Sequence, residues 1–219
     1  MQTQLRIVAG TLRGRKLICD VNEAMRPTPQ MVREALFSIL GNAVPGRPFY
    51  DVFAGTGING IEAVSRGASL GVFLERDFRI IGDLEDNLNK FGLRDRTRII
   101  RGDAYKWVER WQPPKEPSVL FLSPPFADLD HKPDEMLNLI ATLRDRLPNG
   151  SVIVLQLEES IVLAQLPQRQ QWDERRYGRN HLLFWVQGEA GTDQPSTLTP
   201  SEAVPQSEGD DDHPEPDGA

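Results

Sequence analysis

Two short segments contain residues whose types and spacing suit group-transfer chemistry. The first, residues 51–60, reads Asp-Val-Phe-Ala-Gly-Thr-Gly-Ile-Asn-Gly and follows the start of an apolar stretch. Its glycines, Gly55, Gly57 and Gly60, permit positive φ, let a ligand approach the backbone, and let a following helix pack closely on a strand. The second, Ser123-Pro124-Pro125-Phe126, ends another apolar stretch, and its prolines stop the strand and stiffen the loop. A cofactor loop and a rigid loop at two strand ends predict group transfer rather than simple binding.

Acidic residues at the ends of neighbouring predicted strands would add polar contacts to this site. Glu75 could accept hydrogen bonds from a ribose diol, and Asp103 could accept one from an adenine amine. A glycine pattern followed by an acid also satisfies the dinucleotide fingerprint, so a nicotinamide oxidoreductase is a competing interpretation. Asp51 would repel a pyrophosphate but suits a ligand that carries an ammonium and a sulfonium. Together with a proline loop suited to gripping a flat base, these acids favour S-adenosylmethionine.

The same residues also have structural interpretations. Glu75 could pair only with Arg76 or Arg79, and Asp103 could serve as the N-cap of the next helix. Phe126 could be an aromatic residue of the core.

The pattern of apolar residues predicts alternating strands and helices. Thr28 followed by proline predicts a helix start with Thr28 as its N-cap. The nearly all-apolar strands indicate a mostly parallel sheet with helices on both faces, preceded by a hairpin arm. Strands are predicted at 5–9, 16–18, 50–53, 70–74, 97–100, 119–122 and 151–157, with a closing antiparallel pair around 171–177 and 181–186, and further helices at 58–66, 77–90, 104–111 and 134–147.

Charge and composition divide the chain into three predicted regions. Residues 189–219 contain nine acidic residues and no lysine or arginine, and we expect this tail to be disordered because it has little to bury. The chain as a whole has a net charge of −7, but without this tail 25 basic residues face 23 acidic ones. The basic residues of 1–47 make that part a candidate surface for a polyanion. Residues 1–47 are therefore predicted to form an N-terminal hairpin arm and helix that can face a polyanion, and residues 48–188 to form the catalytic core.

Other features narrow the class of protein. No run of apolar residues is long enough for a transmembrane helix or a signal peptide, so we expect a cytoplasmic protein without a membrane partner. The single cysteine, Cys19, excludes a cysteine-cluster zinc site, and His131 and His181 have no partners at metal-binding spacing. We therefore predict no metal, and a monomer.

Taken together, the motifs resemble the RsmD-like family of 16S ribosomal RNA guanine-N2 methyltransferases over about residues 5–186. The resemblance implies a Rossmann-like class I methyltransferase fold with a seven-stranded sheet, S-adenosyl-L-methionine as cofactor, and small-subunit ribosomal RNA or an assembling 30S particle as partner. The matching segments are Arg6-Ile-Val-Ala-Gly10, Gly14-Arg-Lys-Leu17, Arg26-Pro-Thr28, Val32-Arg-Glu-Ala-Leu-Phe37, residues 51–57, Glu62-Ala-Val-Ser-Arg-Gly-Ala68, Leu74-Glu-Arg-Asp77, Gly102-Asp103-Ala104 and Tyr177-Gly178-Arg179.

The resemblance also implies a role for each matching position. The predicted acceptor loop, which would hold the target base, is Ser123, Pro124, Pro125 and Phe126. The predicted cofactor-binding residues are Asp51, Phe53, Ala54, Gly55, Thr56, Gly57, Gly60, Glu75, Arg76, Asp103 and Ala104. The predicted RNA-binding residues are Arg6, Arg13, Arg15, Lys16, Arg26, Thr28 and Arg33.

One position departs from the family pattern. Where the family has Asp or Asn before the two prolines, this chain has Ser123. The lone pair of an exocyclic amine is delocalised into the base, and an acceptor that binds the amine hydrogens exposes that lone pair to a methyl group. Serine offers a shorter, uncharged acceptor. Three interpretations therefore stay open: a guanine-N2 methyltransferase, a catalytically impaired binding protein, and an amine methyltransferase for another nucleic acid.

Overall fold

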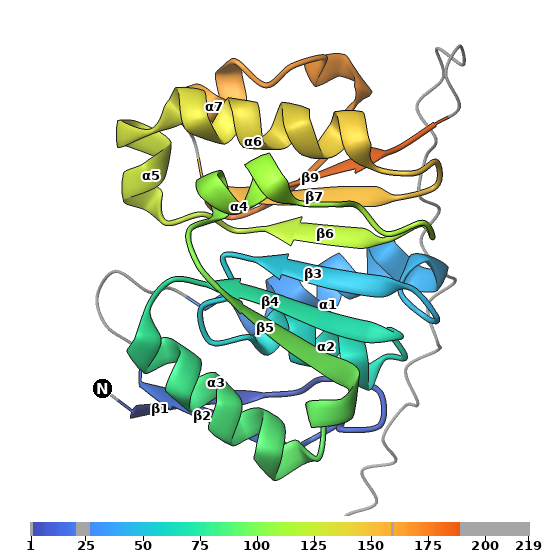
Figure 1. The fold of residues 1–219 in the computed structure, drawn as a ribbon, viewed down its shortest axis with the longest axis vertical. Helices are drawn as coiled ribbons and strands as arrows, with labels where there is room; N and C mark the ends of the chain where they lie inside the picture. The colour runs from blue at the N-terminus through green and yellow to red at the C-terminus, as the bar shows by residue number, and fades with distance from the viewer. Residues whose placement is uncertain (1, 21–26, 159, 189–219) are drawn as a thin grey trace, which may run out of the picture.

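The computed structural model describes residues 2–20, 27–158 and 160–188. The chain forms a seven-stranded sheet covered by helices and a separate two-stranded hairpin (Figure 1). Predictions for Arg26 and for residues 189–219 fall outside the described residues. No helix within these ranges is long and apolar enough to span a bilayer.

Strand order in the large sheet fixes where a ligand can enter. The order is β5-β4-β3-β6-β7-β9-β8, so the chain moves outward from β3 in one direction and resumes beside β3 with β6. The first five strands of this order, β5 to β7, pair in parallel, whereas β9 pairs antiparallel with both β7 and β8. The strands are β3 (Pro48–Val52), β4 (Leu70–Glu75), β5 (Thr97–Arg101), β6 (Val119–Leu122), β7 (Val152–Leu157), β8 (Asp173–Tyr177) and β9 (Asn180–Val186). The switch point therefore lies between β3 and β6.

Helices cover both faces of this sheet, which explains why its central strands are almost wholly apolar. On one face lie α1 (Gln30–Leu40), α2 (Ile58–Ser65) and α3 (Phe78–Phe91). The other carries α4 (Ala104–Arg110), α5 (Phe126–His131), α6 (Pro133–Arg146) and α7 (Ile161–Ala164). Short 3-10 turns occupy Gly41–Ala43, Arg94–Arg96 and Arg169–Gln171. All four residues of β6 and all six of β7 are buried.

Capping residues set both ends of α3, but the cap predicted for α1 is absent. Asp77 caps α3 through its side chain, and Gly92 ends that helix in the left-handed conformation at φ 68°. The predicted N-cap of the first helix was wrong: α1 begins at Gln30, with Pro29 in the cap position. The hydroxyl of Thr28 instead donates to the side chain of Gln156 on β7, at 2.7 Å. Thr28 therefore joins the start of α1 to the sheet.

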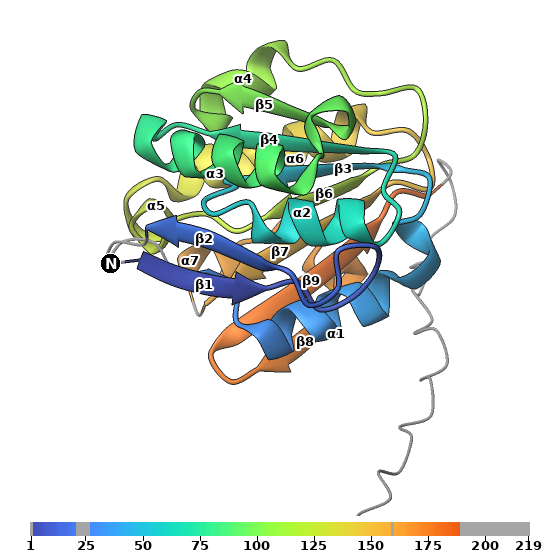
Figure 2. The ribbon, with the colours of Figure 1, turned by 90° about the horizontal axis from the view of Figure 1, so that it is seen from below.

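The N-terminal hairpin is joined to the helices beside it (Figure 2). It consists of β1 (Gln2–Arg6) and β2 (Lys16–Asp20), so the predicted first strand at 5–9 was displaced by a few residues. Glu62 of α2 accepts hydrogen bonds from the backbone N–H groups of Val8 and Ala9, at 2.8 and 2.9 Å. Asn87 of α3 exchanges hydrogen bonds with both backbone groups of Ile18. The hairpin is thus fixed along α2 and α3.

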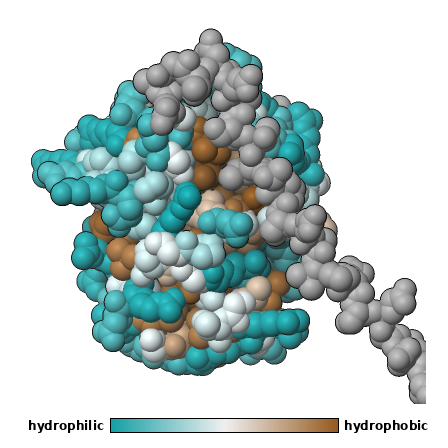
Figure 3. All heavy atoms as spheres, turned by 90° about the vertical axis from the view of Figure 1, so that its right-hand side faces the viewer, coloured by the Kyte–Doolittle hydropathy of each residue, from teal (hydrophilic) through white to brown (hydrophobic). Residues whose placement is uncertain are grey.

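Gly10 marks the closest approach of the hairpin to α2. A Cβ atom on Gly10 would lie 1.9 Å from the carbonyl oxygen of Ser65, and its φ is +81°. Only glycine fits there without backbone movement. The adjacent turn lies at the last residue of α2, beside the amino ends of the parallel strands. Figure 3 shows that side of the molecule, where hydrophobic residues are scattered among hydrophilic ones.

Candidate active site

A cavity of about 480 Å³ opens at the switch point of the sheet. Parallel sheets bind ligands at this edge because the loops after adjacent strands diverge there. The loops after β3, β4, β5 and β6, the end of β7 and the turn between β8 and β9 all contribute to its wall. The lining residues are 27–29, 53–56, 58, 59, 74–77, 80, 102–104, 123–126, 156–158 and 177–180.

The glycine turn forms the floor of one end, which we call the cofactor end (residues 53–56, 75–77 and 102–104). Phe53 adopts a positive φ of 77°, an uncommon conformation for a side chain of its size. Ala54 donates to the carbonyl of Leu74, which ties the turn to β4. Three of the predicted cofactor-binding residues of this turn, Ala54, Gly55 and Thr56, line the cavity.

Two of the predicted cofactor glycines act through packing instead. Gly57 and Gly60 are buried and do not line the cavity. A Cβ atom on Gly57 would lie 2.4 Å from the side chain of Leu84, and one on Gly60 would lie 2.3 Å from the ring of Phe73. Both residues are glycine because α2 packs directly against β4 and α3. A side chain at Gly57 would therefore meet Leu84 and Phe73 rather than a ligand in the cavity.

Asp51 also lies behind the cavity wall. Its side chain is 1% exposed, and its Oδ2 accepts from the backbone N–H of Gly60 at 2.9 Å. Burial raises the pKa of the Asp51 carboxyl well above its usual range. Its Oδ1 has no hydrogen-bond partner within the described chain. The structure does not place Asp51 on the cavity, because its carboxylate holds the start of α2 and lies behind the wall.

Glu75 lies on the cavity wall and organises two loops. Its Oε2 accepts from the backbone N–H of Gly55 at 2.8 Å, and its Oε1 accepts from those of Arg76 and Asp77. These backbone hydrogen bonds, rather than an ion pair with Arg76 or Arg79, position the Glu75 side chain. A carboxylate has about four acceptor positions, so one remains beyond these three bonds. Glu75 can accept a hydroxyl while keeping its backbone contacts.

Asp103 has two structural contacts while lining the cavity. Its Oδ1 caps α4 by accepting from the backbone N–H of Tyr105 at 2.9 Å. Its Oδ2 lies 3.7 Å from the guanidinium of Arg76, which is also 3.9 Å from Asp128. Tyr105 donates its hydroxyl to Asp128 at 3.0 Å.

This group of Arg76, Asp103, Tyr105 and Asp128 links the cofactor end to α5 of the acceptor loop. Desolvation by burial, together with the neighbouring Asp128 carboxylate, raises the pKa of Tyr105 above its usual value. Tyr105 therefore stays a neutral donor. Asp128 is 6% exposed and does not line the cavity, so it is no substitute acceptor for a target base. The sequence analysis predicted Arg76 and Asp103 at the cofactor end but not their contacts with Tyr105 and Asp128.

The opposite end, which we call the acceptor end, contains the proline loop. Ser123, Pro124, Pro125 and Phe126 all line the cavity. Pro125 takes the N-cap position of α5, a helix that was not predicted because its first residues were interpreted as loop. Phe126 combines both interpretations, since it lines the cavity and packs against the core cluster beneath α6.

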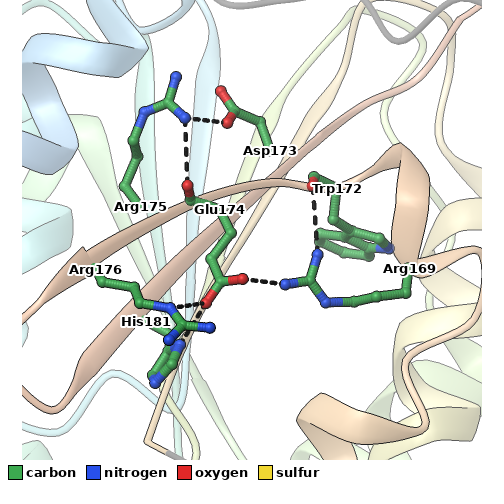
Figure 4. A network of polar contacts seen from close by, with 7 residues as sticks. All are labelled: Arg169, Trp172, Asp173, Glu174, Arg175, Arg176 and His181. Atoms are coloured by element: carbon green, nitrogen blue, oxygen red, sulfur yellow. Dashed lines mark hydrogen bonds and ion pairs between the residues drawn. The ribbon is translucent and has the colours of Figure 1, made fainter.

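The turn between β8 and β9 closes the acceptor end, and a charged network holds it. Figure 4 shows Glu174 of β8 among Arg169, Arg176 and His181. Its Oε1 lies 2.8 Å from Arg176 and 2.5 Å from His181, and its Oε2 pairs with Arg169. Desolvation opposes ionisation, but hydrogen bonds from His181 and Arg176 prevail and lower the pKa of Glu174 to about 2. The sequence analysis assigned no role to this network.

Most predicted RNA-binding residues are exposed but distant from the cavity. Arg6, Arg13, Arg15 and Lys16 are exposed near the turn of the hairpin, beside the last residue of α2, whereas the cavity lies at its first residue. The guanidinium of Arg15 lies 4.5 Å over the ring of Phe91 and donates to the carbonyl of Lys90. These side chains can meet only a part of a polyanion that lies away from the cavity.

Arg33 is buried, so the structure does not expose it to RNA phosphates as predicted. Its side chain is 2% exposed and donates to the backbone carbonyls of Thr28 and Arg6, at 2.8 and 2.7 Å. Burial is the largest cause of the lowered pKa of its guanidinium. Thr28 is also buried, but it lines the cavity. Both residues belong to the interior.

Three polar residues of the acceptor end were missed. All three, Asn59, Gln156 and Asn180, line the cavity. Thr28 joins Asn59 to Gln156, and Gln156 donates to Asn180. Gln156 had a visible signal: it is the only polar residue in the six-residue apolar run of β7, and it is 8% exposed. A buried amide in such a strand usually indicates a specific partner.

Comparison with known proteins supports this description. A Bacillus subtilis (strain 168) protein, YlbH, provisionally named an rRNA methyltransferase, is 33% identical over 166 residues, which cover 74% of this chain and 86% of that protein. The ribosomal RNA small subunit methyltransferase D of Haemophilus influenzae is 36% identical over 126 residues, 56% of this chain and 64% of its own length. This chain thus matches slightly less than two thirds of the latter protein.

Solved structures share the fold. The Escherichia coli protein yhhF, provisionally described as a methyltransferase, superimposes with a TM-score of 0.70 at 29% identity, covering 85% of this chain and 99% of that one. An RNA methyltransferase from Salinibacter ruber in complex with S-adenosyl-L-homocysteine has a TM-score of 0.55 at 18% identity, covering 78% and 99%, and so supports the fold alone. The family described as Conserved hypothetical protein 95 matches residues 5–186. This match confirms the resemblance drawn from the motifs, and the chain belongs to that family.

Proposed function

We propose that this chain is an S-adenosylmethionine-dependent methyltransferase that modifies the N2 amine of a guanine in small-subunit ribosomal RNA. The supporting observation is a single cavity with the glycine turn, Glu75 and Asp103 at one end and Ser123 to Phe126 at the other. Such a cavity places a donor molecule and an acceptor base in contact, which group transfer requires. The small-subunit methyltransferase D relative supports the ribosomal substrate.

The residues present fit the proposed cofactor. Glu75 retains an acceptor position for a ribose hydroxyl, and Asp103 lies on the wall after the next strand. Gly55 leaves the backbone open at the start of the turn. When bound there, S-adenosylmethionine would supply an activated methyl group on a positively charged sulfur. We propose Phe53, Ala54, Gly55, Thr56, Glu75, Arg76, Asp103 and Ala104 as its contacts.

Ser123 and the rigid loop after it are proposed to prepare the base. The Ser123 hydroxyl and a neighbouring backbone carbonyl accept the hydrogens of the exocyclic amine, which directs the nitrogen lone pair toward the cofactor end. Pro124 and Pro125 restrict the backbone, so the acceptors keep their positions as the base arrives. Phe126 offers an aromatic surface to the flat base.

The hairpin is proposed to bind a second stretch of RNA. Arg6, Arg13, Arg15 and Lys16 are exposed beyond the far end of α2, a helix of eight residues and therefore about 12 Å long. Contacts at that distance hold the phosphate backbone while the target nucleotide enters the cavity. We propose that the protein acts as a monomer in the cytoplasm.

The decisive experiment supplies methyl-labelled S-adenosylmethionine and small ribosomal subunits that lack the modification, followed by mass spectrometry of the nucleosides. We expect label in N2-methylguanosine. Tight cofactor and ribosome binding without transfer would favour the alternative of an impaired binding protein, which the serine at position 123 suggests. Label in a different amine, or only in DNA, would establish the third interpretation instead.

A further inference from the structure

A chain of polar side chains crosses the acceptor end of the cavity. Asn59 of α2 donates from Nδ2 to the hydroxyl of Thr28 at 3.1 Å, and that hydroxyl donates to Oε1 of Gln156 at 2.7 Å. Gln156 of β7 then donates from Nε2 to Oδ1 of Asn180, the first residue of β9, at 3.0 Å. These residues come from separate parts of the fold and all four line the cavity.

Three of the four residues in this hydrogen-bonded series are buried. Thr28, Asn59 and Gln156 are 4%, 5% and 8% exposed. Oδ1 of Asn59 has no hydrogen-bond partner within the described residues, although buried acceptors are normally satisfied. Apolar side chains of similar shape would fill this space without the free-energy cost of burying polar groups. The polar chain therefore points to a requirement of the ligand rather than of packing.

The direction of the hydrogen bonds fixes what Asn180 offers to the cavity. The Thr28 hydroxyl accepts from Asn59, so its single hydrogen is directed to Gln156. Gln156 thus uses its oxygen toward Thr28 and its nitrogen toward Asn180. Asn180 accepts this bond with its oxygen, and its Nδ2 makes no hydrogen bond to another described residue. Asn180 consequently presents a hydrogen-bond donor.

The position of Asn180 in the sheet determines which edge of a base it can meet. The strands that carry the cofactor end, β3, β4 and β5, lie on one side of β6, whereas β9 lies two strands beyond β6 on the other side. A base at Ser123 therefore turns one edge to the cofactor end and another to Asn180. When the N2 amine of guanine faces the cofactor, the O6 and N7 edge faces away, and both of these atoms are acceptors. Adenine and cytosine carry a donor amine on the corresponding edge.

The geometry points to Asn180 as a specificity-determining residue that donates from Nδ2 to the O6 or N7 edge of a guanine. Gln156 and Thr28 are positioning residues, because they hold the Asn180 amide in this orientation. The inference rests on the proposed function and adds a mechanism for choosing the base.

Two substitutions of Asn180 separate recognition from packing. Asn180→Ala removes the donor, and we expect kcat/KM for small ribosomal subunits to fall about tenfold, as for one neutral hydrogen bond. Asn180→Asp keeps the size and the acceptor for Gln156 but places a negative oxygen against acceptor atoms. We expect a loss of at least about a hundredfold, with unchanged S-adenosylmethionine affinity in calorimetry. A packing role predicts the reverse order, since aspartate is nearly isosteric with asparagine.

A second set of variants tests the hydrogen bonds that link Thr28 to Asn180. Thr28→Val preserves shape and removes the hydroxyl, and we expect kcat/KM to fall severalfold in the wild-type background but not in the Asn180→Ala background. Asn138→Ala, on the exposed surface of α6, is the matched control and should behave as wild type.

The outcomes distinguish this inference from the function beneath it. A wild-type protein that methylates no ribosomal substrate would remove the proposed function and the inference with it. An active wild type with Asn180→Asp equal to or better than Asn180→Ala would overturn the inference alone. A fall in cofactor affinity or melting temperature that matches the fall in kcat/KM would assign Asn180 a structural role, with the same result.

Discussion

The two ends of the cavity differ in whether the backbone or side chains form their walls. At the cofactor end, backbone conformation and close glycine packing set the geometry. Even the side chain of Glu75 accepts three hydrogen bonds from backbone N–H groups. At the acceptor end, side chains set it: the amide chain from Asn59 to Asn180 and the charged network around Glu174. A wall made of backbone tolerates few substitutions, whereas a wall made of side chains can change its ligand through single replacements. The comparison predicts that cofactor binding and base choice are separable.

The largest expected effect concerns Ser123 at the acceptor end. A carboxylate forms a charge-assisted hydrogen bond about twice as strong as a neutral one, and a lost transition-state contact costs about 10²–10³ in rate. Ser123→Asp should therefore raise turnover on small-subunit RNA toward that range, while calorimetry shows little change in cofactor affinity. Ser123→Ala should lower turnover. A slower Ser123→Asp enzyme would mean that the pocket is adapted to serine.

Gly57 tests the cofactor end through its backbone. Gly57→Ala introduces a Cβ atom 2.4 Å from Leu84 at a φ of +74°, and both the left-handed conformation and overpacking destabilise the fold. We expect a loss of about 2–4 kcal/mol in the free energy of unfolding, measured by urea denaturation, and weaker cofactor binding. Gly82→Ala is the control, because nothing lies within 4 Å of a Cβ atom there. Equal stabilities of the two variants would contradict the packing argument.

Glu174 tests the charged support of the acceptor end through pH. Its folded-state pKa of about 2 lies below the ordinary value of 4.5, so the carboxylate stabilises the fold above pH 4.5 and loses that contribution between pH 4.5 and about 2. Because Arg176 is largely exposed, we expect Glu174→Gln to cost only about 1 kcal/mol at pH 7. Melting temperatures of wild type and variant should converge as the pH approaches 2. A gap that stays constant with pH would exclude this charge as its source.

The smallest effect should come from the hairpin, which belongs to neither end. Neutralising Arg13 and Arg15 should flatten the slope of log affinity against log salt by about two units in RNA binding, because two phosphate contacts release fewer counterions. Turnover at saturating RNA should stay constant, since the cavity lies at the other end of α2. An unchanged slope would remove the hairpin from the RNA interface.

The sequence predicted the strands better than the contacts of the site. Near-continuous apolar runs define strands such as β6, whose bounds were predicted correctly at 119–122. The glycine turn and the proline loop also lie directly after apolar strands, as their patterns predicted. Both are local signals, carried by residues that are adjacent in the chain.

The misplaced residues share a physical cause. Asp51 and Arg33 were interpreted from their charge, but each is buried and committed to backbone groups. A sequence shows that a group is ionisable and does not show which distant backbone atoms will surround it. The Asn59–Thr28–Gln156–Asn180 chain was missed for the same reason: its members meet only after the sheet has brought together α2, β7 and β9.

The bond between the hairpin and Glu62 has a consequence for the order of events during synthesis. Val8 and Ala9 emerge from a translating ribosome early, yet the carboxylate that binds them lies more than fifty residues farther along the chain. Their backbone N–H groups must stay hydrated until α2 has emerged and folded against its neighbours. We therefore expect the amino-terminal strands to become ordered late, so that the amides of residues 8 and 9 exchange with solvent in ribosome-bound chains that stop before α2 and are protected once α2 has emerged.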